Sequence, residues 1–316
     1  MTSLEYAFAD PDLVASPPIL VDVGAAGDLH PIWRKIARFS IGVGFEPDAR
    51  EAPSLSAAQR QFKRWVFCPC LATAENPASG HHPLHLALAP QCSSSLKPRQ
   101  DRLQEWVFAD QFEVVRTENL PAKKLRDALH EEGIDTIDWL KCDTQGTDLR
   151  LFLSLPESIH ASIAAVELEP GIMEAYAGED HSADVMAAMR GRSYWLADFR
   201  LGNTPRGRAA DLADLGSIWS RDWIRRLAPT APGWAGLTYL RDVSLPPPPQ
   251  TRRDWLLVWV FATLLGQHGY AVSVATQGRV KFPGERFDRL HAESLRSLKW
   301  AMVRRFPRWA WNRLTR

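Results

Sequence analysis

Short apolar runs alternate with amphipathic segments along most of the chain. Apolar runs bounded by glycine, proline or charged residues predict strands at residues 19–23, 40–45, 64–71, 84–87, 112–117, 137–142, 162–169, 194–199 and 237–241. Apolar positions at helical spacing predict helices at residues 31–39, 51–62, 122–132, 149–155, 184–190, 252–265 and 286–306. Strands and helices that alternate at these lengths predict an α/β fold, in which a Rossmann-like, mostly parallel sheet carries helices on both faces.

Proline-rich segments indicate where the chain divides. The first 18 residues end in two prolines, directly before the first predicted strand. Four consecutive prolines within residues 245–250 predict a stiff polyproline spacer. We therefore expect an N-terminal leader (1–18), a Rossmann-like domain (19–244), a polyproline linker (245–250) and a basic helical C-terminal extension (251–316).

The composition is typical of a globular protein, with 45% hydrophobic and 24% charged residues and a net charge of +1. This balance gives no global argument for an acidic partner. The N-terminus lacks a basic segment followed by an apolar run, so no signal peptide is expected. Four cysteines without an export signal favour a reducing, cytoplasmic location and no disulfides. The longest apolar run, residues 255–265, is too short to cross a bilayer.

Positive charge is concentrated near the C-terminus. Residues 279–316 contain eleven Lys or Arg and three Asp or Glu, together with Trp300, Trp309 and Trp311. This pattern fits a helix at the inner face of a membrane, on anionic lipid. It also fits a helix that docks on its own catalytic domain, or self-association through residues 286–316, and we favour docking over the membrane. No aromatic-basic motif of a nucleic-acid-binding module occurs, so we expect no nucleic acid partner.

The first predicted strand runs into a turn that contains two glycines. Glycine removes a side chain where the backbone must approach a ligand, and a strand, a tight turn and a helix form the usual nucleotide-binding layout. About twenty residues further on, the second strand ends in an acidic residue that suits ribose hydroxyls. A third glycine is missing, which favours S-adenosylmethionine over a dinucleotide, because no pyrophosphate has to be bound. The expected cofactor contacts here are Asp22, Gly24, Ala25, Gly27, Glu46 and Pro47.

Carboxylates also stand at the ends of two later strands. Asp143 follows the strand at 137–142, where it would act as a base on an acceptor hydroxyl, orient it, or cap the next helix. Glu167 and Glu169 project to one face of their strand, and two carboxylates in one site raise the pKa of one of them. Alternatively, only Glu169 reaches the pocket while Glu167 is paired with Arg or Lys. We take Asp143 and Glu169 as the catalytic candidates; for Lys141, a buried ion pair is as reasonable as catalysis.

Four segments stand in the order typical of FkbM-family methyltransferases. They are VDVG (21–24), GFEP (44–47), CSSSL (92–96) and DWLKCDTQG (138–146). The last is the most distinctive, because it resembles that family's strand ending in Leu-Lys-x-Asp-x-x-Gly. The stretch VELEP (166–170), the tyrosine after it and the closing strand at 237–241 are also similar. The resemblance covers residues 19–242.

The resemblance implies a Rossmann-like fold that uses S-adenosylmethionine to methylate a hydroxyl of a saccharide, glycolipid or polyketide. It implies that Asp22, Gly24 and Gly27 line the methionine end of the cofactor and that Glu46 holds the ribose. Asp143 and Gln145 then lie at the pocket mouth.

Adenine is the part of the cofactor where the sequence departs from the family. The family's third strand leads into a small residue and an acid, whereas here the text is Ala72-Thr73-Ala74-Glu75. Either a displaced Glu75 contacts adenine, or the backbone and Ser94–Ser95 do so.

Two other functions fit the same fold. The first is a non-catalytic scaffold or binding protein, which the C-terminal segment would tether to a glycan-assembly complex. The second is an NAD-dependent sugar oxidoreductase, although a complete Gly-x-Gly-x-x-Gly is absent.

Cysteines and histidines between residues 68 and 92 contain metal-ligand chemistry. The Cys68-Pro69-Cys70 spacing is tighter than a usual zinc knuckle and falls in a predicted strand, so we expect packed thiols and no metal. The remaining candidates are His81, His82, His85 and Cys92. Trp219, Trp223 and Trp234 are candidates for a sugar-stacking wall, although most tryptophans are core residues.

Overall fold

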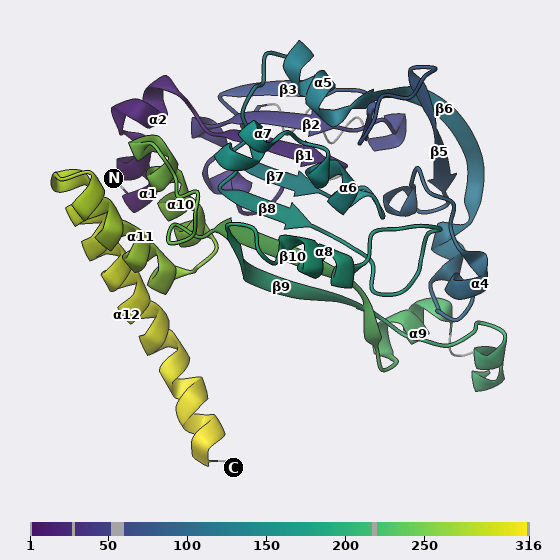
Figure 1. Cartoon of the computed structure of the whole chain (residues 1–316). Helices are drawn as coiled ribbons and strands as arrows, with labels where there is room; N and C mark the ends of the chain where they lie inside the picture. The colour runs from purple at the N-terminus through teal and green to yellow at the C-terminus, as the bar shows by residue number, and fades with distance from the viewer. Residues whose placement is uncertain (1, 27–28, 52–59, 217–219, 315–316) are drawn as a thin grey trace.

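A seven-stranded sheet forms the centre of the fold (Figure 1). The computed structural model of the chain describes residues 2–26, 29–51, 60–216 and 220–314. The strands follow the order β3-β2-β1-β7-β8-β10-β9. Their bounds are β1 Ile19–Val23, β2 Ile41–Phe45, β3 Arg64–Cys68, β7 Trp139–Cys142, β8 Ala165–Leu168, β9 Tyr194–Thr204 and β10 Ala231–Arg241. Neighbours from β3 to β8 are parallel, and β10 runs antiparallel to both β8 and β9. The predicted Rossmann-like, mostly parallel sheet is therefore confirmed.

Helices cover both faces, and alternate strand residues face them. On one face, Leu20 and Trp139 join a hydrophobic cluster with helices from both ends of the chain. On the other, Val21 and Leu140 pack with the helices of the middle of the chain. The first group is α1 Ser3–Phe8, α2 Pro11–Ala15, α10 Arg252–Leu264, α11 His268–Lys281 and α12 Glu285–Leu314. The second is α5 Leu125–Glu131, α6 Asp148–Leu153, α7 Glu157–Ser162 and α8 Ser182–Met189.

A second sheet of three strands differs from the prediction. The strand expected at 64–71 is broken after β3 by Pro69, and its last residues form β4 (Leu71–Thr73) in this second sheet. β4 pairs in parallel with β6 (Val114–Lys124), which pairs antiparallel with β5 (His81–Ala87). The segment at 76–98, expected as a loop with one short strand, thus contributes the longer strand β5 to this second sheet.

Two expected helices take another course. Residues 31–39 form two short 3₁₀ turns, Trp33–Lys35 and Ala37–Phe39, because Ile36 between them adopts a non-helical conformation. The helix expected at 51–62 falls mostly on residues 52–59, which lie outside the described residues.

The two ends of the chain belong to the same core. The segment expected as a leader forms α1 and α2, whose Ala7, Phe8 and Leu13 are buried in the cluster that contains α10. The sequence did not indicate this packing, because it brings together helices more than 230 residues apart. In the described part of the chain, no helix has both the length and the apolar content needed to cross a membrane.

A buried ion pair joins α10 to the sheet. The carboxylate of Asp138, just before β7, is fully buried and accepts hydrogen bonds from both terminal nitrogens of Arg253, at 2.8 and 2.6 Å. It also accepts the backbone N–H of Ile19 at 2.8 Å. One carboxylate therefore fixes α10 against the starts of β1 and β7.

Replacing Arg253 by Met should lower the free energy of unfolding by roughly 3–5 kcal/mol, because it leaves the Asp138 charge buried without a counter-ion. The double variant R253M/D138N should recover part of this loss. The control R279M removes an exposed pair with Asp288 and should change stability by about 0.5 kcal/mol or less. Urea unfolding measures all three, and equal losses for R253M and R279M would contradict the assignment.

Candidate functional site

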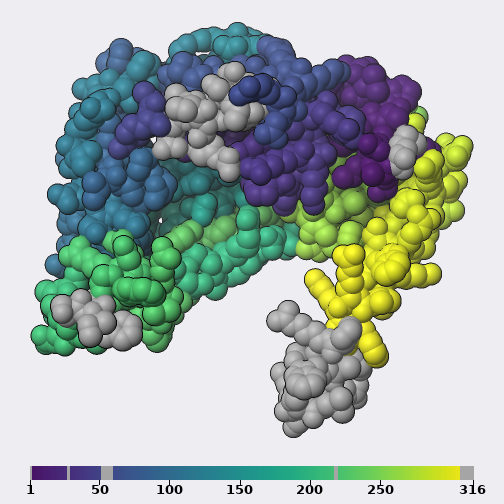
Figure 2. All heavy atoms as spheres, turned by 180° about the vertical axis from the view of Figure 1, so that it is seen from behind, coloured from purple at the N-terminus to yellow at the C-terminus, as the bar shows by residue number. Residues whose placement is uncertain are grey.

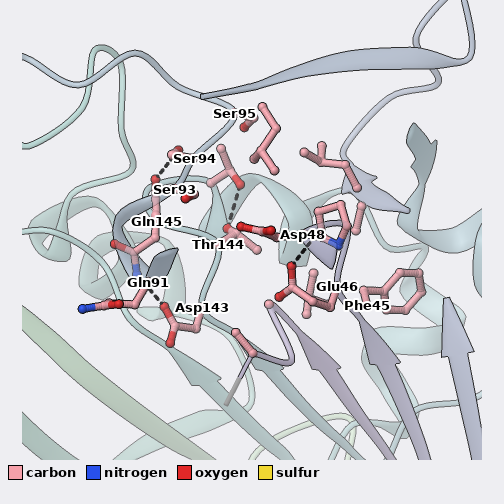
Figure 3. Close-up of a pocket in the computed structure, with 18 of the residues that line it drawn as sticks. Phe45, Glu46, Asp48, Gln91, Ser93, Ser94, Ser95, Asp143, Thr144 and Gln145 are labelled. Carbon is pink, nitrogen blue, oxygen red and sulfur yellow. Dashed lines mark hydrogen bonds between the residues drawn. The ribbon is translucent and has the colours of Figure 1, made fainter. Parts of the chain in front are cut away.

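A cavity of about 170 Å³ lies at the carboxyl ends of β1, β2 and β7 (Figure 3). From β1 the strand order runs one way through β2 and β3 and the other way through β7 and β8. This reversal is where ligands bind in open α/β sheets. Of the expected cofactor contacts, six line the cavity: Gly24, Glu46, Pro47, Ser94, Asp143 and Gln145. Asp22 and Ala25 are described but are not among its lining residues, and Gly27 lies outside the described residues.

At Gly24 the turn after β1 passes close to the backbone of Asp143, directly after β7. The φ of Gly24 is +84°, and a Cβ at this position would lie 2.0 Å from the carbonyl oxygen of Asp143. The N–H of Gly24 donates to the carbonyl of Phe45 at 3.0 Å, while the N–H of Asp143 donates to that of Val23 at 2.9 Å. The turn after β1 is thus held between its two neighbouring strands, and only glycine fits there.

Glu46 lies at the end of β2 with 8% of its surface exposed. Its carboxylate accepts the backbone N–H of Asp48 at 2.7 Å. Asp48 in turn binds Arg50 at 2.6 Å, and Arg50 donates to the carbonyl of Ala87 and to the Ser93 hydroxyl, at 3.1 and 3.0 Å. These bonds connect the end of β2 to β5, so the second sheet closes one side of the cavity.

Gln145 holds the Asp143 side chain in place (Figure 3). It is the one described non-glycine residue with positive φ, at 56°, a strained conformation that its neighbours maintain. Its side-chain amide donates to Asp143 at 2.8 Å and accepts from the Tyr176 hydroxyl at 3.2 Å, while its carbonyl accepts from Ser94 at 2.7 Å. No local sequence pattern indicates this conformation.

Asp143 does not cap the following helix. That interpretation is wrong because Asp148, the first residue of α6, accepts both the N–H and the hydroxyl of Thr144, at 2.9 and 2.5 Å. Asp143 is left to face the cavity (Figure 3).

A second cavity of about 310 Å³ adjoins the first. Both are lined by Gln91, Asp143 and Gln145, so these side chains stand between them. The second cavity has largely apolar and aromatic walls, together with Glu169, and these walls include Phe112, Met173, Tyr176 and Trp234. Among the tryptophans expected to form a wall, Trp234 is present here, Trp223 is 55% exposed on α9 (Arg221–Leu227), and Trp219 lies outside the described residues.

Glu169 reaches the second cavity, whereas Glu167 does not. The pKa of Glu169 is raised to about 8, first by burial and second by the negative charge of Asp143. Glu167 instead binds Arg200 at 2.6 Å and lies 3.4 Å from His30. The pair of interacting carboxylates is therefore Asp143 and Glu169, and the alternative in which Glu167 forms an ion pair is confirmed.

Asp22 supports the site from beneath. It binds the ammonium of Lys141 at 2.8 Å, and both are mostly buried. Burial alone would lower the pKa of Lys141, but the carboxylates of Asp22 and Asp143 outweigh it and raise that pKa. Lys141 thus forms a buried ion pair, one of the two roles that the sequence left open.

The cysteines between residues 68 and 92 do not lie in one group. Cys68 and Cys70 are buried in the cluster under α5 and α6, whereas Cys92 packs in a different cluster with Phe112 and Tyr176. Burial raises the pKa of the Cys68 and Cys92 thiols to about 12, which disfavours the thiolate that a metal needs. Among the described residues, no group of three or more potential ligands is placed to hold a metal ion.

Comparison with known proteins finds only distant likenesses. No protein-family model matches the chain, and no curated protein gives a significant match. Two solved structures are similar over most of their length. A Streptococcus pneumoniae protein assigned as a tRNA (m1A22) methyltransferase is 8% identical, with 91% of this chain and 95% of that chain covered and a TM-score of 0.31. The 23S rRNA methyltransferase ErmE is 9% identical, with 89% and 82% covered and a TM-score of 0.30.

Replacing Gly24 by Ala should lower the free energy of unfolding more than replacing Gly133. Both have positive φ, but a Cβ at Gly133 meets nothing within 4 Å. G133A should therefore cost about 1 kcal/mol from backbone strain alone. G24A should cost roughly 2 kcal/mol more, because the turn must move away from Asp143. Urea unfolding compares them, and equal values would mean that the turn is free to relax.

Replacing Glu169 by Gln should change how stability depends on pH. The pKa of Glu169 rises from its ordinary 4.5 to about 8 on folding, so the folded protein holds a proton that the unfolded chain releases. Wild-type stability should therefore fall relative to E169Q as pH rises through this window, and the difference should be constant above it.

The measurement is urea unfolding of both proteins across the window. E113Q, at an exposed glutamate just before β6, is the control and should follow the wild type. Parallel curves for wild type and E169Q would show that Glu169 does not bind this proton.

Proposed function

We propose that this chain is an S-adenosylmethionine-dependent O-methyltransferase of the FkbM type. The observation that carries the proposal is the pair of adjoining cavities at the carboxyl edge of the sheet, which share Asp143 and Gln145. Methyl transfer needs the donor and the acceptor to bind in neighbouring sites with the methyl group between them, and two adjoining cavities suit this requirement. The four segments that resemble the family all contribute residues to the first cavity.

The first cavity suits S-adenosylmethionine. Gly24 lines this cavity at the turn after β1, and the nearly buried Glu46 carboxylate offers acceptors to ribose hydroxyls. Ser94 and Ser95 line this cavity, whereas Glu75 lines only a neighbouring cavity that shares Ser95 with it, so we place adenine beside the serines. The carboxylates of Glu46 and Asp143 favour a cationic sulfonium over the pyrophosphate of a dinucleotide.

The second cavity suits a hydroxyl-bearing acceptor. Aromatic rings such as Phe112 and Trp234 provide faces on which a sugar ring packs. We therefore assign a saccharide, glycolipid or similar natural product as the acceptor class.

Asp143 and Glu169 would receive the acceptor's proton. The bound cofactor supplies an electrophilic methyl group on its sulfonium sulfur. The bond between methyl and sulfur breaks, and the rest of the cofactor leaves as a neutral thioether. The chain aligns the acceptor oxygen with that methyl group, and the hydroxyl proton passes to the Asp143–Glu169 pair. Gln145 fixes Asp143 through its 2.8 Å hydrogen bond, and the raised pKa of Glu169 makes this carboxylate a stronger base than an ordinary one.

Isothermal titration with S-adenosylmethionine tests the donor site. E46Q should bind about tenfold more weakly than the wild type, because charged hydrogen bonds to the ribose are lost. E113Q, at an exposed glutamate that lines neither cavity, is the matched control and should bind normally. D143N should keep its affinity within a few-fold but release S-adenosylhomocysteine more slowly with saccharide or glycolipid acceptors.

The outcomes separate the rival functions. Absence of binding by the wild type would favour the non-catalytic scaffold, and binding of NAD in its place would favour the oxidoreductase. Unchanged turnover in D143N would remove Asp143 from the mechanism while leaving the donor site intact.

A further inference from the structure

The second half of α12 extends away from the rest of the molecule (Figures 1 and 2). In the first half, Phe287 and Leu290 are fully buried, and the Ser294 hydroxyl accepts a hydrogen bond from the Trp259 indole at 2.8 Å. From Leu295 to Phe306 no residue is buried. The helix therefore packs on α10 and α11 through its first three turns, and residues 295–306 form a separate exposed surface.

This surface carries large apolar side chains. Trp300 and Phe306 are each 61% exposed, and Met302 and Val303 are each 62% exposed. Leu295 lies seven residues before Met302, on the same side of the helix, and Phe306 follows one turn later. Such a concentration of exposed apolar side chains indicates an interaction site.

The same surface is strongly basic. Residues 295–306 contain four Lys or Arg and no Asp or Glu. Residues 1–278, in contrast, contain 27 Lys or Arg and 34 Asp or Glu, so the rest of the molecule is net acidic. Two copies of this helix side by side would bring like charges together with no acidic side chain between them, which disfavours a helix-to-helix dimer.

We propose that residues 295–306 of α12 bind the surface of an anionic lipid bilayer, with the helix lying in the interface. Leu295, Met302 and Val303 enter the boundary between headgroups and acyl chains. Arg296 and Arg304 bind lipid phosphates. A nucleic acid would satisfy the arginines, but it offers no apolar layer for Met302 and Val303. This proposal does not depend on methyl transfer.

Vesicle co-sedimentation of the full chain tests the proposal. Vesicles of mixed phosphatidylglycerol and phosphatidylcholine should bind the protein, and vesicles of phosphatidylcholine alone should bind it at least about tenfold more weakly. Raised salt should weaken the binding, because it screens the arginines and lysines.

Two variants separate the apolar and charged contributions. The triple variant L295S/M302Q/V303S and the double variant R296Q/R304Q should each lower the vesicle partition coefficient about tenfold or more. The matched control L88Q/V115S changes two exposed apolar residues, one directly after β5 and one on β6, which are 57% and 54% exposed, and should bind like the wild type. Because all these side chains are exposed, each variant should keep the wild-type circular dichroism and melting temperature.

Several results would overturn the proposal. These are wild-type binding by the triple variant, or no binding of the full chain to anionic vesicles at low salt. Light scattering that shows a dimer, lost in the triple variant without any vesicle binding, would identify a second copy as the occupant. Binding to single-stranded RNA in place of vesicles would identify a nucleic acid.

Discussion

The cross-strand register of β1, β7 and β8 is the constraint on which the site depends. It places Asp22, Lys141 and Glu167 beside one another in a single row. Because side chains alternate along a strand, Gly24, Asp143 and Glu169 form the next row on the same face, two residues further on. A slip of one residue in any strand would turn its charged and site residues toward the apolar cluster under α5 and α6.

Lys141 in the lower row affects the pKa of Glu169 in the upper row. Lys141 is a buried cation between two buried carboxylates, so its charge is compensated within the sheet. Its positive charge lowers the pKa of Glu169, whereas burial and Asp143 raise that pKa, and the latter two prevail. Burial and the neighbouring Asp143 therefore set the raised pKa of Glu169, and Lys141 in the row beneath only moderates it.

Much of the sheet and part of the site could be predicted because their signals are local. An apolar run that ends in glycine or an acid marks both a buried strand and a carboxyl-edge position, which identified Gly24, Glu46 and Asp143. The second sheet could not be predicted in this way, since β4 finds its partner about fifty residues away along the chain. The ion pair of Asp22 with Lys141 joins residues 119 apart, and only the register shows that Asp22 lies under the cavity and not in it.

Negative and positive charges lie in different parts of the molecule, and this separation would orient the protein on a membrane. Carboxylates line both cavities, whereas every charged residue between 295 and 306 of α12 is basic. If α12 lies on anionic lipid, the net acidic remainder of the chain is repelled by the same surface that attracts the helix. This attraction and repulsion would together restrict the orientations that the protein adopts on the membrane. An acceptor carried by a lipid would meet cavities held at a fixed height, set by the rigid packing of Phe287 and Leu290 against the core.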